Sequence, residues 1–206
     1  MNISYPIERT AILIIDPYND FLSEGGKLNG PASPIMESVG TLRHMREVVA
    51  AARAAEMQVI YVPHHRATPA DLQSWAHPTP YQLAASEAQA FAVATWGGEW
   101  HPEFVPRPRD IIVREHWGSS GFANTDLDFQ LKQHRLDHVV LIGMIANTCL
   151  ESTGKFGVEL GYHVTLVRDA TAAFSSEAMR VAHEINGPTY AHAILQTTEL
   201  LGLLPR

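Results

Sequence analysis

Cys149 is the residue of this chain best suited to nucleophilic chemistry, because it stands at the start of a predicted helix. A thiol in the first turn of a helix faces unpaired backbone N–H groups and the positive end of the helix dipole, which favour the thiolate. The same amides, with those of the turn Gly143–Thr148, are suited to binding an oxyanion. A lone cysteine is also commonly a small buried hydrophobic residue, so its position alone leaves both interpretations open.

Two further polar groups come directly after apolar segments. Asp16 follows the run AILII, where an unpaired carboxylate is costly and could serve as a general acid and base. An aspartate before a proline is also a common turn residue, so this second interpretation stays open as well. The cluster Glu115-His116-Trp117 follows the run IIVR, and the Trp117 indole could form the wall of a pocket or belong to the core.

The segments that must position these groups are short, β-branched and apolar, as expected of parallel strands covered on both faces. Because they alternate with helical patterns, we predict an α/β fold with a doubly wound, mostly parallel sheet and helices on both faces. Ligands bind beyond the carboxyl ends of such strands, where the three clusters would meet. The predicted strands are Ala11–Ile15, Gln58–Val62, Ile111–Arg114, His138–Ile142 and Val164–Val167, with a weaker one at Ala191–Leu195.

Helical spacing and capping residues predict the intervening helices. Ser33-Pro34 resembles an N-cap followed by a proline in the first turn, and Gly161 is a suitable residue just after a helix end. The stretch His64–Arg109 is rich in proline, and we interpret it as one helix inside long loops, which are often lids or interfaces. The predicted helices cover Ile35–Ala55, about Tyr81–Ala92, a start at Thr125–Asp128, Cys149–Leu160, and Ser175 or Ser176 to near Asn186.

The overall composition is that of one globular domain, 1–206. The chain has 206 residues with 46% hydrophobic content, a net charge of −7 and no run of Lys or Arg, which argues against nucleic acid as a partner. No secretory pattern and no apolar run of membrane-spanning length is found in the sequence, so no membrane partner is expected. One cysteine excludes an internal disulfide, and we expect a cytoplasmic location.

Several phrases resemble the isochorismatase-like cysteine hydrolases, which include isochorismatases, nicotinamidases and related amidases. The resemblance covers most of the chain and is weakest in the proline-rich middle. It is carried by the combination D-x-x-N-D-F, S-x-F-x-x-T-D-L, G-x5-C and a trailing D-A. In this sequence the corresponding stretches are ILIIDPYNDF, SSGFANTDLDF, LIGMIANTCLESTGKF, VRDATAAF and the later TTEL.

The resemblance implies a Rossmann-like three-layer fold and a covalent intermediate on Cys149, with Asp16 as its acid/base partner. It also implies a non-proline cis peptide between Met144 and Ile145, and an oxyanion hole made by the amides of Ile145 and Cys149. The function that follows is cysteine-dependent hydrolysis of a small amide, imide or isochorismate-like substrate. A C–N amidohydrolase fits this family best.

The chain departs from the family where most members place the lysine of an Asp/Lys/Cys triad. None of Lys27, Lys132 and Lys155 lies in that motif. Counting forward from Asp110 puts Glu115 at the lysine position, whereas counting back from Phe122 puts His116 there. We favour Glu115 as the third catalytic residue, with His116 beside the substrate.

The two choices differ physically. A protonated His116 would supply the missing cation, whereas Glu115 would repel Asp16 and force the two carboxylates to share a proton. The departure leaves a second hypothesis open, namely an altered or inactive homologue that binds a small ligand in the same pocket.

Neither a metal nor a cofactor is expected. The sequence has 11 histidines, but the stretch VPHHRATPADLQSWAH lacks the Asp-x-His spacing by which nicotinamidases of this family hold a metal. The adjacent His64 and His65 would point in opposite directions on an extended chain. There is also no glycine-rich phosphate loop. The expected partners are a small-molecule substrate and further copies of the chain in a homo-oligomer.

Overall fold

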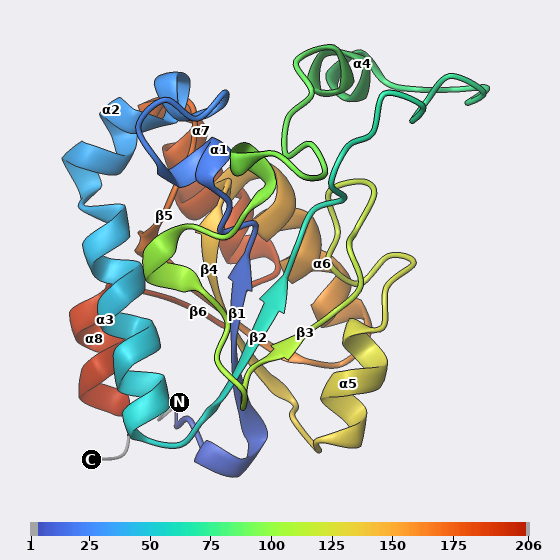
Figure 1. Ribbon diagram of the computed structural model, residues 1–206. Coiled ribbons are helices and arrows are strands. Elements are labelled where there is room, and N and C mark those ends of the chain that lie inside the picture. The colour runs from blue at the N-terminus through green and yellow to red at the C-terminus, as the bar shows by residue number, and fades with distance from the viewer. Residues whose placement is uncertain (1–3, 205–206) are drawn as a thin grey trace.

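The computed structural model describes residues 4–204 of the chain. Its centre is a six-stranded sheet in the order β3-β2-β1-β4-β5-β6, in which every pairing is parallel (Figure 1). The chain builds the sheet outward from β1 to β3, then returns to the other side of β1 to add β4, β5 and β6. The strand order therefore reverses between β1 and β4, which is where such sheets bind ligands.

The helices and strands have the following bounds. The strands are β1 Thr10–Ile15, β2 Gln58–Val62, β3 Ile111–Ile112, β4 His138–Met144, β5 His163–Ala172 and β6 Ala193–Leu195. The α-helices are α1 Asn19–Leu22, α2 Asn29–Val39, α3 Thr41–Ala54, α4 Pro80–Glu87, α5 Leu127–Gln133, α6 Glu151–Glu159, α7 Ser176–Arg180 and α8 Thr197–Leu203. Short 3-10 or π segments are η1 Ile7–Arg9, η2 Trp96–Gly98, η3 Pro102–Phe104, η4 Ala146–Leu150, η5 Val181–Asn186 and η6 Gly187–Thr189.

The sheet separates two hydrophobic cores, and β1 contributes to both. Its residues Ile12 and Ile14 belong to one core, whereas Leu13 and Ile15 belong to the other, because successive side chains of a strand point to opposite faces. Helices α2, α3 and α8 cover the first face, and α5 and α6 cover the second (Figure 1). This arrangement confirms the predicted doubly wound α/β fold with helices on both faces.

Most predicted strands are confirmed, and the largest difference in length is in β5. β5 continues to Ala172, five residues beyond its predicted end, and all but two of its ten residues are buried. β3 is shorter than predicted and ends at Ile112. The weakly patterned last strand is present as β6.

The prediction of one helix over Ile35–Ala55 is wrong. Two helices occupy this region, because Gly40 adopts a left-handed backbone with φ 77° and breaks the chain between α2 and α3. Pro34 lies inside α2 rather than in its first turn. The buried side chains Ala32 and Met36 pack this helix against the core, and this packing outweighs the local preference of proline for a helix start.

Other helices begin or end where tertiary contacts decide. α4 ends at Glu87, before the predicted Ala92, because Gln89 and Phe91 adopt positive φ angles of 49° and 53°. The amide of Phe91 donates instead to the buried carboxylate of Asp20 at 2.7 Å. No helix within residues 4–204 has the length and apolar character needed to cross a membrane.

Candidate active site

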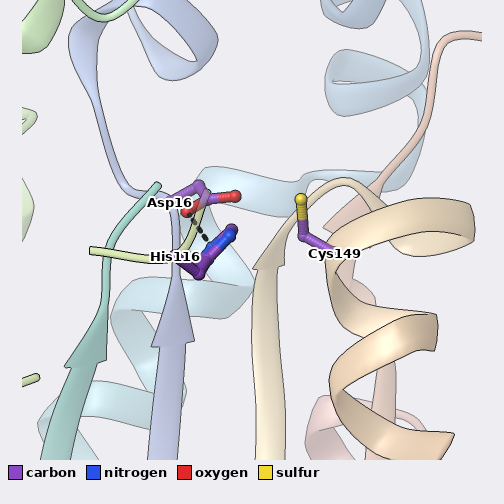
Figure 2. A group of neighbouring side chains, drawn as sticks. All are labelled: Asp16, His116 and Cys149. Carbon is purple, nitrogen blue, oxygen red and sulfur yellow. Dashed lines mark hydrogen bonds and ion pairs between the residues drawn. The ribbon is translucent and has the colours of Figure 1, made fainter. Parts of the chain in front are cut away.

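Three buried side chains meet at the edge of the sheet where its strand order reverses. Asp16 directly follows β1, Cys149 lies in η4 just after β4, and His116 follows β3 (Figure 2). One nitrogen, oxygen or sulfur atom from each residue lies within 4.8 Å of those of the other two. The structure therefore brings Asp16 and Cys149 together as expected from their strand ends, and the third member is His116, the residue that the count back from Phe122 indicates.

Asp16 is held in an unusual backbone conformation. Its φ angle of 53° is rarely adopted by residues other than glycine, and its amide donates to the Val62 carbonyl at 3.2 Å. One carboxylate oxygen, Oδ1, accepts a hydrogen bond from His116 Nε2 at 3.1 Å. The other, Oδ2, is buried without a hydrogen-bond partner, and Figure 2 shows it directed toward Cys149. Such strain at a buried polar group is typical of a functional site.

The prediction that Glu115 faces Asp16 is wrong, and the register of the sheet gives the reason. Tyr61 of β2 pairs with Ile112, but His64 pairs with His116, so the segment after β3 contains one extra residue. The amide of His116 donates to the Pro63 carbonyl at 2.9 Å, which fixes the new register. A shift of one residue exchanges the two faces of an extended chain, so it turns His116 inward and Glu115 outward.

Glu115 instead binds cations of the loop that follows β2. Its carboxylate accepts hydrogen bonds from Arg66 Nε at 2.6 Å and from the Arg66 amide at 3.0 Å, and lies 3.2 Å from His65 Nδ1. Burial acts to raise the pKa of Glu115, but the hydrogen bonds from His65 and Arg66 outweigh it and lower the pKa to about 2. Glu115 is therefore an ionised anchor beside the site.

His116 occupies the position where a cation is needed. Burial acts to lower its pKa, but the charge of Asp16 and the hydrogen bond to it outweigh burial, so the pKa of His116 is raised overall. Its other ring nitrogen, Nδ1, lies 2.7 Å from the Gly118 carbonyl. An imidazolium donates from both nitrogens, so both contacts match the protonated form.

Cys149 is a thiol rather than a thiolate at rest, contrary to the expectation from its place at a helix start. Burial contributes most to raising its pKa well above the ordinary value, and the nearby charge of Asp16 acts in the same direction. The helical segment begins at Ala146, with the π-type turn η4 leading into α6. Only Thr148, whose hydroxyl lies 3.7 Å from the sulfur, and the backbone of Ile145 act to lower the pKa.

The turn before Cys149 has a specific backbone geometry. The peptide bond between Met144 and Ile145 is cis, and Gly143 has a φ angle of 116°. A Cβ at Gly143 would collide with the backbone oxygen of Ile15, so only glycine allows β4 to pass this close to β1 at the site. Ile145 is buried at the start of this turn.

A cavity of about 750 Å³ opens onto Asp16 and Cys149. Trp117 lines it, as the sequence suggested, and stacks on His65 with ring centroids 3.5 Å apart. A second hollow of about 680 Å³ lies beside Arg9, Lys132 and Asp137. It adjoins the opposite ends of β1 and β4, so it cannot be the substrate site for Asp16, His116 and Cys149.

Several cavity residues could not be identified from the sequence, and most of them lie between β2 and β3. Tyr81 is the most informative, since its side chain is 54% exposed and lines the cavity, where partial desolvation and the charges of Cys149 and Asp16 raise its pKa. Its helix α4 could be anticipated, because Thr79 and Gln82 form a capping box. No local pattern indicates which side of α4 faces the site. Further cavity residues missed by the sequence are Phe21, Leu72, Ala84, Ala85 and Phe91.

Polar residues after β1 hold the segment between β2 and β3 in place. The Asn19 side-chain amide donates to the Trp96 carbonyl at 2.9 Å. Asp20 is buried and accepts from the Phe91 amide, and a Cβ at Gly97 would collide with its carboxylate. Asp169 has a related structural role at a distance, since its Oδ1 accepts from the amide and hydroxyl of Thr197 at the start of α8.

The donor atoms of Asp16, His116 and Cys149 form the group within residues 4–204 whose spacing could hold a metal ion. His64 and His65, considered above as metal ligands, and His101 of the same region are engaged elsewhere. His65 Nε2 lies 2.8 Å from Asp71, His64 Nδ1 lies 2.9 Å from the His65 carbonyl, and the ring of His101 accepts from the Glu103 amide. A metal-independent site stays a prediction.

A family model and a sequence relative both relate the chain to known hydrolases. The isochorismatase domain model matches residues 10–198. The ureidoacrylate amidohydrolase RutB of Rhizobium rhizogenes is 30% identical over 172 residues, which are 79% of this chain and 70% of that protein.

Two solved structures are also similar. A cysteine hydrolase from Pseudomonas syringae pv. phaseolicola has a TM-score of 0.83 at 24% identity, covering 98% of this chain and 95% of that one, which shows a shared fold. N-carbamoylsarcosine amidase from Thermoplasma acidophilum has a TM-score of 0.66 at 25% identity, covering 92% and 96% of the two chains.

Proposed function

The chain belongs to the isochorismatase family, and on that premise we propose that it is a cysteine-dependent amidohydrolase that cleaves a C–N bond. The observation that carries this proposal is the buried cluster of Asp16, His116 and Cys149 at the reversal point of the sheet. Relatives named for amide hydrolysis favour an amide over other substrates of the family.

The proposed reaction begins with proton transfer from the Cys149 thiol to Asp16. The free Oδ2 of Asp16 is directed toward the sulfur (Figure 2), and the raised pKa of Cys149 means that the thiol needs a base at the moment of attack. The sulfur then attacks the amide carbon and forms a tetrahedral oxyanion. We assign its stabilisation to the backbone amides of Ile145 and Cys149, in the turn that contains the cis peptide.

Collapse of this intermediate breaks the C–N bond and leaves a thioester on Cys149. The proton held by Asp16 goes to the leaving nitrogen, which departs as ammonia or an amine. Asp16, again a carboxylate, then takes a proton from water as the water attacks the thioester carbon. Release of the carboxylic acid returns the proton to the Cys149 sulfur, so one water is consumed for each amide cleaved.

We assign His116 the role that lysine has in most of the family. Its imidazolium donates a hydrogen bond to Asp16 Oδ1 and supplies a positive charge beside the carboxylate. This orients Asp16 with Oδ2 toward the thiol. The missing lysine was the reason to consider an inactive ligand-binding homologue, and the raised pKa of His116 weakens that reason.

The proposal is tested by trapping the covalent intermediate. Intact-mass spectrometry of the wild-type protein during turnover of an amide should show an adduct equal to the acyl group. The adduct should be absent in Cys149→Ala, and in that variant kcat should fall by about 10³-fold or more.

Cys149→Ser is the matched control for folding, since it keeps the size and shape of the side chain. It should retain the wild-type melting temperature while losing most of the activity. Wild-type activity in Cys149→Ala would remove the nucleophile assignment, and a failure to hydrolyse any small amide would contradict the function itself.

A further inference from the structure

The cavity in front of Cys149 is bounded mainly by apolar side chains. Its walls include the aromatic rings of Tyr81, Phe91 and Trp117 and the aliphatic side chains of Leu28 and Leu72. Its volume of about 750 Å³ is that of a small-molecule site. A substrate group in contact with these walls gains most by being apolar.

The charges around this cavity are already paired. Among the described residues that line it, none is a lysine or arginine, whereas two, Asp16 and Asp71, are carboxylates. Asp71 accepts hydrogen bonds from His65 and from the amide and hydroxyl of Thr68. Within the described part of the chain, the cavity therefore offers no unpaired cation to a ligand.

The histidines and the nearby arginine provide no free positive charge to the cavity. Burial lowers the pKa of His64, which keeps that ring neutral. His65 lies between Asp71 at 2.8 Å and Glu115 at 3.2 Å, and Glu115 also binds the Arg66 guanidinium at 2.6 Å. A carboxylate entering the cavity would have to break one of these pairs or stay unpaired, and both are unfavourable.

We propose, building on the amidohydrolase function above, that the substrate is an amide with a neutral, apolar acyl group and that the site rejects amides bearing a carboxylate. Ureidoacrylate and N-carbamoylsarcosine are both carboxylates by their chemical names. The chain therefore differs in substrate charge from the relatives named for these compounds. This preference for a neutral substrate comes from the side chains of the cavity walls and not from Asp16, His116 or Cys149.

The test uses two amides of the same shape and different charge, 4-methylbenzamide and 4-carbamoylbenzoate. They share the ring and the scissile amide and differ only in a methyl or a carboxylate group. For the wild-type enzyme kcat/KM should be higher for 4-methylbenzamide by on the order of 100-fold, because the carboxylate of the other amide would lose water without finding a free cation.

A pair of variants on α4 tests whether the preference for the neutral amide arises in the cavity. Ala84 is an exposed residue that lines the cavity, whereas Leu83 lies on the same helix, is 50% exposed and is not part of the lining. Ala84→Arg should narrow the ratio between the two amides by about tenfold, because it adds a cation to the wall. Leu83→Arg adds the same charge outside and should leave the ratio unchanged.

Binding separates this inference from the proposed function. If neither amide is hydrolysed, the hydrolase proposal fails, and calorimetry with Cys149→Ala still decides the charge preference. Tighter binding of 4-methylbenzamide supports the inference. Equal or tighter binding of 4-carbamoylbenzoate, binding of neither compound, or efficient turnover of 4-carbamoylbenzoate by the wild type overturns it.

Discussion

The floor of the site and its cover are built by different means. The floor consists of Asp16, His116 and Cys149, all buried at strand ends whose positions follow from the ladder of the sheet. The cover is the segment 64–110, which contains one α-helix, α4, and two 3-10 turns, η2 and η3, within long loops. The difference suggests that the floor determines which bond is broken and the cover determines which substrate is held.

A few specific contacts attach the cover to the floor. Tyr18, just after β1, stacks on Trp100 with ring centroids 5.1 Å apart, and its hydroxyl donates to the His64 carbonyl at 2.9 Å. Asp20 holds the amide of Phe91. These contacts begin in the loop after β1 and in α1, so residues close to Asp16 in the chain also position the walls of the cavity.

Replacing Asp16, the proposed base in the floor, should have the largest effect. Asp16→Asn removes the only carboxylate in the buried cluster of Asp16, His116 and Cys149, so kcat should fall by about 10³-fold, within the range typical of general-base removal. Steady-state kinetics on a neutral amide measures the loss. The result would also show whether the buried Cys149 thiol depends on Asp16 for its activation.

The matched control is Asp71→Asn, which makes the same change in a carboxylate of the cover. We expect it to alter KM while changing kcat by less than about threefold, because Asp71 lies against His65 and Thr68 rather than the thiol. Comparable losses of kcat in both variants would show that the floor and the cover do not divide the work as described.

Replacing the cation of the floor should have an intermediate effect. His116→Asn keeps a hydrogen-bond donor but removes the charge, and kcat should fall by about 10- to 100-fold. His116→Lys restores the charge found in most of the family and should recover part of the activity. If His116→Lys is no better than His116→Asn, the cation assignment for His116 is wrong.

The role of His116 also predicts how activity changes with pH. The pKa of His116 is raised in the folded protein, so its charge is present below its ordinary value near 6.5 and is lost as the pH rises through the raised pKa. Wild-type activity and the stabilisation from the Asp16–His116 pair should decline together on that alkaline side. The His116→Lys variant should stay active to higher pH, since a lysine keeps its charge longer.

The contrast between floor and cover also explains what the sequence could predict. Strand runs such as AILII and HVVLI are apolar on both sides, so the central strands and the positions of Asp16 and Cys149 at their ends were predictable. The third residue could be narrowed only to Glu115 or His116, because the extra residue after the two-residue strand β3 changes the register between Ile112 and His116. An irregular ladder leaves no periodicity from which to count.

The cover was predictable only as a helix among loops. The end of α4 depends on the hydrogen bond between Asp20 and Phe91, residues 71 positions apart in the chain. A local pattern carries no information on such a pairing. The position of Tyr81 near Asp16 and Cys149 depends on the same long-range contacts.

Tyr81→Phe, a change in the cover, should have a smaller effect on activity than the changes in the floor. The hydroxyl of Tyr81 is close enough to Cys149 and Asp16 for their charges to raise its pKa, so it can hydrogen-bond a bound substrate. Its loss should raise KM by about three- to tenfold, the worth of one hydrogen bond, and leave kcat nearly unchanged. Leu83→Ala on the same helix is the control and should change neither constant. A fall in kcat without a change in KM would move Tyr81 into the catalytic floor.

The smallest effect on activity is expected for Glu115→Gln. This variant tests whether Glu115 only holds the cover in place and lies outside the proposed triad of Asp16, His116 and Cys149. Because Glu115 contacts Arg66 and His65 and not Asp16, kcat should change by less than about threefold. Stability should fall by about 1 kcal/mol at pH 7, as for a partly exposed ion pair with hydrogen bonds.

The lowered pKa of Glu115, about 2 in the folded protein, fixes how this loss depends on pH. A group with a depressed pKa stabilises the fold above its unfolded pKa, near 4.5, and loses that contribution as the pH falls toward 2. Urea unfolding at pH 7 and pH 3 should therefore show a larger difference between wild type and Glu115→Gln at pH 7. A large loss of kcat at unchanged stability would instead return Glu115 to the triad and displace His116.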